Sequence, residues 1–257
     1  MTNSSDMLLV TTDGPVATLT MNRPAKRNAM CDELLEALEA FFSNQPEGVR
    51  AVILTGTAGH YCSGLDLSEH VSRDAEGTMR HSRNWHRVMD IIQFSGLPVV
   101  SAMFGAVIGG GLELATSTHV RIAEPSTIFQ LPEGMRGIFV GGGATVRVGR
   151  IIGSDRMCEM MLTGRKYGAE EGLRLGLAHY AVAEGEALPM AYDLARKIAD
   201  NATLSNYVMI QGIARIEDMS KADGFFTESL CAAIAQTSPD AVEGLAAFLE
   251  KRTPSFR

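Results

Sequence analysis

Two glutamates that follow turn-like segments are the residues in this sequence best suited to acid–base chemistry. Glu113 comes directly after Gly109-Gly110-Gly111-Leu112, and Glu133 follows Leu131-Pro132. Burial among such apolar neighbours raises a carboxyl pKa toward neutrality, where general acids and bases work best. Two carboxyl groups facing one small space can divide the roles, one protonated and one ionised. The alternative for any arbitrary pair of glutamates is that both are ordinary surface carboxylates.

The glycines before Glu113 predict a turn with unusual access to the backbone. Without Cβ atoms, the chain at residues 109–111 can come into direct contact with a bound group. A helix that starts at Glu113 would add unpaired N–H groups, which favour developing negative charge. No Lys-Ser/Thr pair follows and the pattern is not GxGxxG, so a nucleotide-phosphate loop is not indicated. The alternative is a tight turn that allows close packing of helix and strand.

Other catalytic classes have little support in the sequence. His60-Tyr61-Cys62-Ser63-Gly64 places a thiol and a hydroxyl together, but no GxSxG elbow accompanies them. The six histidines show no HExxH or comparable ligand spacing, so no metal site is expected. The four cysteines include no CxxC pair, which argues against a disulfide framework and favours reduced thiols in the cytoplasm.

The elements that would position the glutamates follow from the hydrophobic pattern. Two alternating segments around Asp13-Gly14 predict a β-hairpin, and short apolar runs elsewhere predict buried parallel strands. Apolar residues at helical spacing predict amphipathic helices, and Asp32 is placed to cap or favour the start of the first one. We expect strands at residues 7–12, 16–22, 51–56, 99–103, 120–123 and 127–130, and helices around 34–42, 85–92, 145–151 and through most of the chain from about 169. Residues 68–77 are polar and are expected to form a mobile connection.

Length and charge limit the domain organisation and the partners. A chain of 257 residues without a low-complexity linker fits one α/β domain, with a sheet-based core over residues 1–200 and a helical lobe over residues 201–257. A net charge of −7 argues against nucleic acid or an anionic membrane as the main partner. No apolar run approaches the ~18 residues of a membrane span, so a soluble protein is expected.

Six segments occur along the chain in an order that can be compared with known families. They are Asn22-Arg23-Pro24-Ala25-Lys26-Arg27-Asn28-Ala29-Met30, Tyr61-Cys62-Ser63-Gly64-Leu65-Asp66-Leu67, Gly109-Gly110-Gly111-Leu112-Glu113-Leu114-Ala115, Phe129-Gln130-Leu131-Pro132-Glu133, Leu162-Thr163-Gly164, and Glu243-Gly244 with Phe248-Leu249-Glu250-Lys251-Arg252-Thr253-Pro254. In this order they resemble motifs of the crotonase superfamily, the enoyl-CoA hydratases and isomerases. The resemblance implies a crotonase-like α/β spiral of repeated strand-strand-helix units with a helical C-terminal lobe.

The resemblance also implies a mechanism. In the family the thioester carbonyl lies between two backbone amides, which correspond here to Leu65 and Gly110 and would form an oxyanion hole. Hydratases of the family use glutamates at the positions of Glu113 and Glu133, the first to activate water and the second to deliver a proton to the α carbon. The implied reaction is hydration of a trans-2-enoyl-CoA to a 3-hydroxyacyl-CoA.

Coenzyme A would arrive as part of the substrate, with no prosthetic group. Lys26 and Arg27 are expected to face its phosphates. Phe248 and Lys251 match tail positions that in relatives reach a bound coenzyme A, sometimes in a neighbouring subunit. Family members are typically homotrimers or dimers of trimers, so the C-terminal lobe is expected to mediate trimerisation. The residues implied to bind coenzyme A are Lys26, Arg27, Ser63, Gly64, Leu65, Asp66, Leu67, Phe248 and Lys251.

Departures from the family pattern leave the acyl group and the exact reaction open. Ile138, Phe139, Val140 and Gly141 replace a smaller or proline-containing sequence beside the acyl pocket and would narrow the pocket or change its substrate. Gly141 stands where dienoyl-CoA isomerases carry an aspartate, which favours hydration over isomerisation. Thr118-His119 stands where relatives commonly have Cys-Asp. An enoyl-CoA isomerase, an acyl-CoA hydrolase and a non-catalytic coenzyme A-binding homologue remain alternatives.

Overall fold

A six-stranded sheet forms the centre of the computed structural model, which describes residues 6–68 and 72–256. The first two strands form an antiparallel hairpin, and all other neighbouring strands are parallel. Since the third strand has neighbours on both edges and packing on both faces, all its residues are buried. In spatial order the strands are β1 (Leu8–Asp13), β2 (Val16–Met21), β3 (Ala51–Gly56), β4 (Val99–Met103), β6 (Val120–Ala123) and β9 (Tyr180–Ala181).

A second, three-stranded sheet carries the segments that approach the glutamates. It consists of β5 (Ala106–Ile108), β7 (Ile128–Gln130) and β8 (Tyr167–Gly168), with β5 and β7 parallel. Bridges of parallel type join Cys62 to Val107 and Leu65 to Met30. The Cys62 carbonyl accepts the Ile108 N–H at 3.1 Å, so the chain around Cys62 runs alongside β5. This pairing brings the loop that contains Leu65 to the end of β5, where the glycine turn begins.

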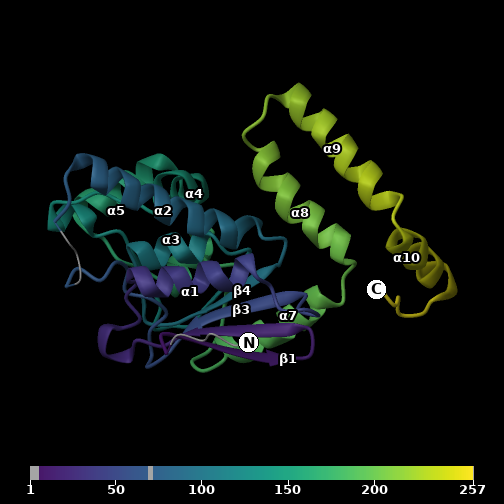
Figure 1. Cartoon of the computed structure of the whole chain (residues 1–257), viewed down its shortest axis with the longest axis horizontal. Helices are drawn as coiled ribbons and strands as arrows, with labels where there is room; N and C mark the ends of the chain where they lie inside the picture. Colours follow the sequence, from purple (N-terminus) through teal and green to yellow (C-terminus); the bar gives the residue numbers. More distant parts are fainter. Residues whose placement is uncertain (1–5, 69–71, 257) are drawn as a thin grey trace.

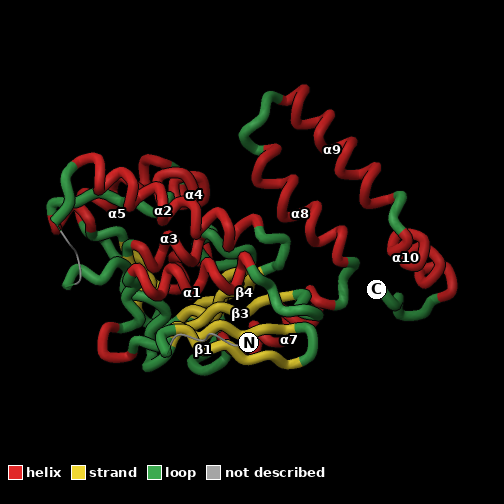
Figure 2. Tube along the Cα trace, in the orientation of Figure 1, coloured by secondary structure: helices red, strands yellow, loops and turns green. Residues whose placement is uncertain are grey.

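Helices cover both faces of the large sheet (Figures 1 and 2). The main core lies between the sheet and the helices of the first half of the chain. On the opposite face, α7 presents alanines at every fourth position, Ala187, Ala191, Ala195 and Ala199, and these small side chains allow the helix to lie close to the strands. The helices are α1 (Asp32–Ser43), α2 (Ala75–Phe94), α3 (Gly110–Thr116), α4 (Ala144–Ile152), α5 (Ser154–Thr163), α6 (Ala169–Leu175) and α7 (Ala187–Ala199), with 3-10 turns η1 (Pro24–Lys26) and η2 (Glu133–Arg136).

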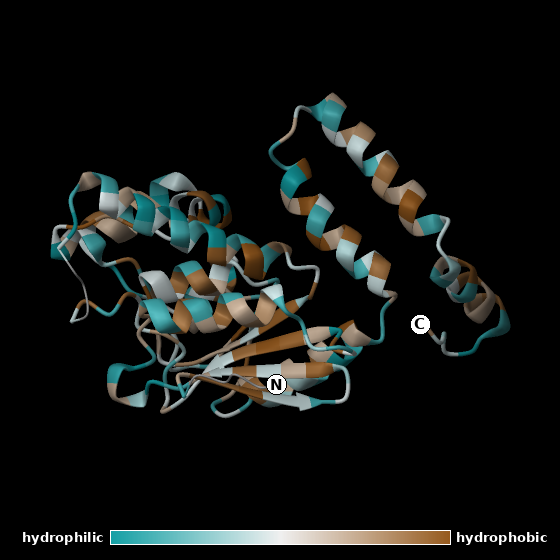
Figure 3. Cartoon of the chain, in the orientation of Figure 1, coloured by the Kyte–Doolittle hydropathy of each residue, from teal (hydrophilic) through white to brown (hydrophobic). Residues whose placement is uncertain are grey.

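The last three helices extend away from the sheet-based body (Figure 1). They are α8 (Thr203–Ile216), α9 (Lys221–Gln236) and α10 (Pro239–Glu250). The predicted boundary near residue 200 falls between α7 and α8, and the division into core and lobe stays a prediction. Apolar residues run along these helices (Figure 3), and many of them are exposed in the single chain. The large exposed apolar side chains here are Tyr207, Met209, Ile213, Phe225, Phe226, Leu230, Ile234, Val242, Leu245, Phe248 and Leu249. Within residues 6–68 and 72–256, no helix combines the length and apolar character required to cross a membrane.

The predicted hairpin, the other predicted strands and the amphipathic helices are confirmed, but two helix starts differ from expectation. The helix that carries Glu113 begins at Gly110, because Gly109 adopts a φ of 55° and its carbonyl accepts the first intrahelical bonds. Of the two predicted roles of Asp32 the second holds: Cys31 occupies the cap position of α1, and Asp32 lies in the first turn, where an acidic side chain favours the helix start. Helix α2 begins at Ala75 within the predicted polar connection, with Asp74 Oδ1 accepting the Gly77 N–H at 2.7 Å. Residues 69–71 of that connection lie outside the described residues.

Candidate active site

Glu113 lies on α3 and is held by the first turn of α4. The residue is 3% exposed, and its Oε1 accepts the Gly142 N–H at 2.7 Å and the Ala144 N–H at 3.0 Å. Burial raises the pKa of Glu113, while these amide donors oppose the rise because they stabilise the ionised form. One carboxylate oxygen is therefore fixed by the backbone, and the second is available for another partner.

Glu133 opens η2 and is 6% exposed, but its environment differs from that of Glu113. Its Oε2 is buried without a hydrogen-bond partner among the described residues. Burial raises the pKa of Glu133 to about 7, and the nearby charge of Glu113 adds to the rise. A methyl group at Gly109 would lie 2.8 Å from Glu133 Oε1, so this carboxyl group rests on the turn that leads into α3. The two glutamates thus lie within electrostatic range of each other on either side of one turn.

Two backbone N–H groups next to this turn are unpaired. Gly64 has a φ of 93°, and a methyl group there would lie 2.6 Å from the Ile108 carbonyl oxygen and 3.1 Å from the Gly110 nitrogen. This close approach requires glycine at residue 64 and places Leu65 beside the start of α3. Among the described residues, neither the Leu65 N–H nor the Gly110 N–H donates to a protein acceptor. Free donors at a helix N-terminus can bind an anionic oxygen.

The glycines of the turn serve internal packing, which was the alternative left open by the sequence. A methyl group at Gly110 would lie 2.6 Å from Trp85 Cζ3 and 3.0 Å from Met30 Cε. At Gly111 a methyl group would overlap the Cys62 carbonyl oxygen. At these two glycines, protein atoms therefore fill the space that a Cβ atom would occupy. What Gly110 offers to a ligand is its N–H group.

Trp85 of α2 is a site residue that the sequence analysis did not identify. It is 4% exposed, and its ring packs against Gly110 and also against Gly142, where a methyl group would lie 3.0 Å from Trp85 Cε3. The indole Nε1 is buried and has no hydrogen-bond partner among the described residues. Apolar spacing on α2 indicated only a core position, and the sole sequence signal was that this is the single tryptophan of the chain.

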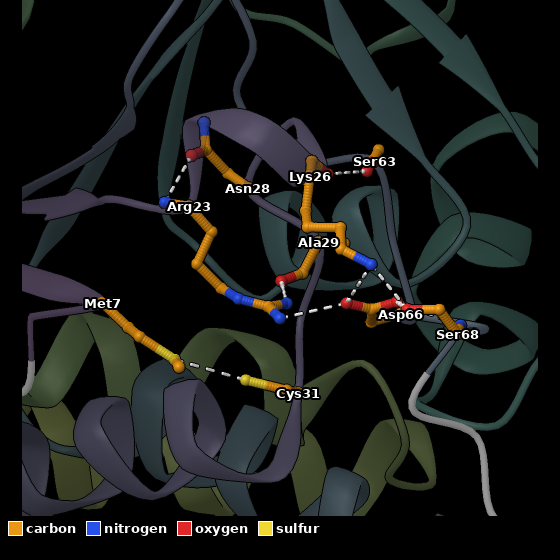
Figure 4. Close-up of polar contacts among 9 residues, drawn as sticks. All are labelled: Met7, Arg23, Lys26, Asn28, Ala29, Cys31, Ser63, Asp66 and Ser68. Carbon is orange, nitrogen blue, oxygen red and sulfur yellow. Dashed lines mark hydrogen bonds and ion pairs between the residues drawn. The ribbon is translucent and has the colours of Figure 1, made fainter.

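Asp66 organises the loop next to the unpaired amides (Figure 4). Arg23 Nη2 donates to its Oδ2 at 3.0 Å, and the Ser68 N–H and hydroxyl donate to its Oδ1 at 3.0 and 2.6 Å. Although burial opposes ionisation, the hydrogen bonds from Ser68 and Arg23 hold the pKa of Asp66 at about 2. Lys26 Nζ lies 3.7 Å from the same carboxylate and donates to Ser68 Oγ at 2.6 Å. Asp66 is thus occupied by protein donors, and Lys26 extends over it from a partly exposed position.

The other residues implied to bind coenzyme A fall into two groups. Near the site, Ser63 Oγ donates to the Lys26 carbonyl at 3.0 Å, and Leu67 is 44% exposed. Arg27 is exposed, and its charge adds to the effect of burial in lowering the pKa of His60. Far from it, Phe248 is 80% exposed on α10 and Lys251 ends that helix (Figure 1). A single chain therefore does not bring Phe248 or Lys251 to the glutamates.

The segment proposed to line the acyl pocket follows η2. Ile138 and Phe139 are 41% and 70% exposed in the single chain, and Val140 packs partly against the core. Gly141 lies beside α2, where Ser82 Oγ donates to the Gly141 carbonyl at 2.7 Å. This hydrogen bond holds the backbone of Gly141, the residue that corresponds to the aspartate of the dienoyl-CoA isomerases. Gly141 directly precedes Gly142, whose amide donates to Glu113.

The Thr118-His119 departure fills structural contacts. His119 Nδ1 accepts the Val99 N–H at 2.9 Å, and its Nε2 lies 3.0 Å from the Gln93 carbonyl, so the ring is neutral with its proton on Nε2. Burial lowers the pKa of His119 to about 4. Thr118 Oγ1 lies 3.0 Å from Ser101 Oγ inside the core. These two residues join β4 to α2 and lie outside the candidate active site.

Two buried carboxyl groups beside amides that have no acceptor among the described residues, on an α/β fold of this kind, are the arrangement expected of a crotonase. The family model for enoyl-CoA hydratase/isomerase matches residues 11–257, and the chain belongs to this family. The structure superposes with a TM-score of 0.93 on a putative enoyl-CoA hydratase from Rhodopseudomonas palustris, which is 46% identical over 95% of each chain.

Curated relatives agree with this assignment. The chain is 32% identical to enoyl-CoA hydratase EchA19 of Mycobacterium tuberculosis, over 97% of this chain and 96% of the relative. It is 31% identical to 2,3-dehydroadipyl-CoA hydratase of Escherichia coli, over 97% of this chain and 98% of the relative. The protein is therefore an enzyme that transforms acyl-CoA thioesters.

Proposed function

We propose that the enzyme hydrates a trans-2-enoyl-CoA to a 3-hydroxyacyl-CoA. The observation that supports this most directly is the pair of buried carboxyl groups in unequal environments, Glu113 held by amides and Glu133 left with an unpartnered oxygen. Hydratases of the same family with this overall length support the choice of reaction.

In the proposed mechanism, the thioester carbonyl of the substrate accepts the N–H groups of Leu65 and Gly110. Addition of water at C3 moves charge onto this oxygen, so the two donors stabilise the enolate more than the substrate. Removing one such preorganised donor generally costs about 2.7–4 kcal/mol of transition-state stabilisation. Because both donors belong to the backbone, the side chain of Leu65 is free to shape the pocket.

The two glutamates then divide the proton transfers. Glu113, whose Oε1 is bonded to the Gly142 and Ala144 amides, acts through its ionised form and takes a proton from water as the oxygen bonds to C3. Glu133, whose pKa is about 7, is available in its protonated form at neutral pH and gives its proton to C2. One water is added across the double bond, and a proton passing from Glu113 to Glu133 through solvent restores the starting state.

Binding of coenzyme A is proposed at the loops around Lys26, Arg27 and residues 63–67. Phe248 and Lys251 contribute to this site only from a neighbouring subunit, because they lie on α10, away from the glutamates of their own chain. We therefore propose a homotrimer or a dimer of trimers, supported by the exposed apolar faces of α8, α9 and α10. Ile138, Phe139, Val140 and Gly141 would border the acyl group. The mechanism uses no metal or prosthetic group.

Incubation with crotonyl-CoA tests the proposal. Loss of the absorbance of the conjugated thioester, with formation of 3-hydroxybutyryl-CoA, is the expected result. Glu113→Gln and Glu133→Gln should each retain thioester binding and lower kcat by ~10²-fold or more, whereas Glu36→Gln, an exposed position on α1, should not. Release of free thiol would indicate a hydrolase, migration of the double bond in a 3-enoyl-CoA an isomerase, and no turnover of a broad acyl-CoA panel a binding protein.

A further inference from the structure

We propose that Arg147 is a positioning residue for Glu113, because its guanidinium joins the turn that holds the Glu113 carboxylate to helix α2. The turn consists of residues 142–144, and Arg147 follows it on the first part of α4. The consequence for turnover rests on the proposed function, whereas the positioning itself can be measured without any substrate.

The guanidinium of Arg147 is bonded in two directions. Toward α2, Nε donates to Gln93 Oε1 at 2.7 Å and Nη2 donates to Asp90 Oδ1 at 2.5 Å. Toward the turn, Nη1 donates to the Gly142 carbonyl at 3.4 Å. The Arg147 side chain is only 11% exposed, so its contacts to Gln93 and Gly142 are partly shielded from water, whereas Asp90 itself is 61% exposed. Arg147 therefore ties the start of α4 to a long helix of the core.

The shape of the turn matches the guanidinium. Gly143 has a φ of 108°, and a methyl group there would overlap Arg147 Nη1. Gly142 is bonded on both sides, since its N–H donates to Glu113 and its carbonyl accepts from Arg147. Loss of the guanidinium would remove the donor to the Gly142 carbonyl. The contacts of Ser82 and Trp85 from α2 would remain, but the two amides that orient the Glu113 carboxylate would be held less firmly.

Arg147 also supplies a positive charge near Glu113. Its charge lowers the pKa of Glu113, in opposition to the larger effect of burial. The other charged or titratable groups around this region are Asp90 and His86 of α2, Arg150 of α4 and Glu133 of η2. Asp90 neutralises Arg147 only in part, because its own side chain is 61% exposed. Removal of Arg147 should therefore raise the pKa of Glu113.

The amide protons of Gly142 and Ala144 report the ionisation and orientation of the Glu113 carboxylate directly, because both amides donate to Glu113 Oε1. We would record their NMR shifts across a pH series in the full-length protein labelled with 15N-glycine and 15N-alanine. Arg147→Met should raise the pH midpoint of Glu113 ionisation and shift both amide resonances. Arg147→Lys, which keeps the charge but not the planar geometry, should raise it less. Arg150→Met, which breaks the exposed pair with Asp218 one turn later on α4, should leave it unchanged.

Kinetics provide the second readout. Arg147→Met should lower kcat with little change in KM. It should also move the acidic limb of the plot of kcat against pH to higher pH, and Arg147→Lys should recover part of the lost kcat. If Arg147→Met does not fold, Asp90→Asn removes the charged one of the two α2 acceptors of the guanidinium, leaving Gln93, and should shift the same two amides. Unchanged amide shifts and midpoint in the folded variants would overturn the proposal. Shifted amides in an enzyme that does not hydrate enoyl-CoA would sustain the positioning role and refute the proposed function.

Discussion

Neutralising Glu133 should make the stability of the protein less dependent on pH. The ordinary pKa of this carboxyl group is 4.5 and the folded protein raises it to about 7, so the unfolded chain loses this proton more readily than the folded one. The contribution of Glu133 is present in full below pH 4.5 and is lost as the pH rises through 7. A difference of about 2.5 pKa units corresponds to about 3 kcal/mol of unfolding free energy. Glu133→Gln mimics the protonated form and removes this loss.

The measurement is urea denaturation of wild type and Glu133→Gln between pH 4.5 and 9, at one protein concentration because self-association would also change the apparent stability. The difference in unfolding free energy should increase by about 3 kcal/mol in favour of the variant over this range. A part of this difference that is the same at every pH tells nothing about ionisation, because burying the Gln amide has its own free-energy cost. Glu36→Gln measures the effect of removing a surface charge. If the difference in unfolding free energy between the two proteins does not change between pH 4.5 and 7, Glu133 is not a buried carboxyl group with an unpartnered oxygen.

Three further outcomes follow from other parts of the structure. Gly110→Ala should destabilise the protein by about 1–3 kcal/mol through overlap with the indole ring, and Trp85→Leu should relieve part of this loss; additive losses in a double-mutant cycle would contradict the contact. The contribution of His119 to the unfolding free energy should fall by about 3 kcal/mol as the pH falls from 6.5 through 4, because the folded state holds His119 neutral with a pKa of about 4. His119→Asn keeps an acceptor for Val99 and lacks this contribution, so the difference in unfolding free energy between wild type and the variant should change by that amount over this range; a constant difference would exclude the effect. Phe226→Lys or Leu245→Lys on the exposed faces of α9 and α10 should reduce the oligomer mass measured by light scattering, whereas an unchanged mass would place the subunit interface elsewhere.

The strands and the hairpin could be predicted because their signals are local. Alternation around Asp13-Gly14 and the continuous apolar run of β3 depend only on neighbouring residues. The start of α3 could not be placed in the same way. Glycine disfavours a helix interior, yet Gly110 and Gly111 lie in the first turn because Trp85 and the Cys62 carbonyl leave no room for a side chain there. Tertiary packing overrides local propensity at these two positions.

The glutamates themselves were identified from the sequence, but the groups that control them were not. The pairing of Glu113 with amides of residues 142–144 depends on the arrangement of α3 against α4, and no spacing pattern encodes it. Arg147 gave no signal, since an arginine on an amphipathic helix is most often a solvated charge. Asp66 lies in a family motif, and only the structure shows that Arg23 and Ser68 occupy its carboxylate. Long-range contacts of this kind determine protonation and orientation.

The most direct test of the two-carboxylate mechanism is mass spectrometry of the product formed from crotonyl-CoA in H2¹⁸O. We expect an intact coenzyme A thioester that carries one ¹⁸O at C3, formed by the wild-type enzyme and strongly reduced in both Glu113→Gln and Glu133→Gln. An ¹⁸O label found in a released carboxylic acid, or a labelled thioester formed at wild-type rates by either variant, would contradict the mechanism.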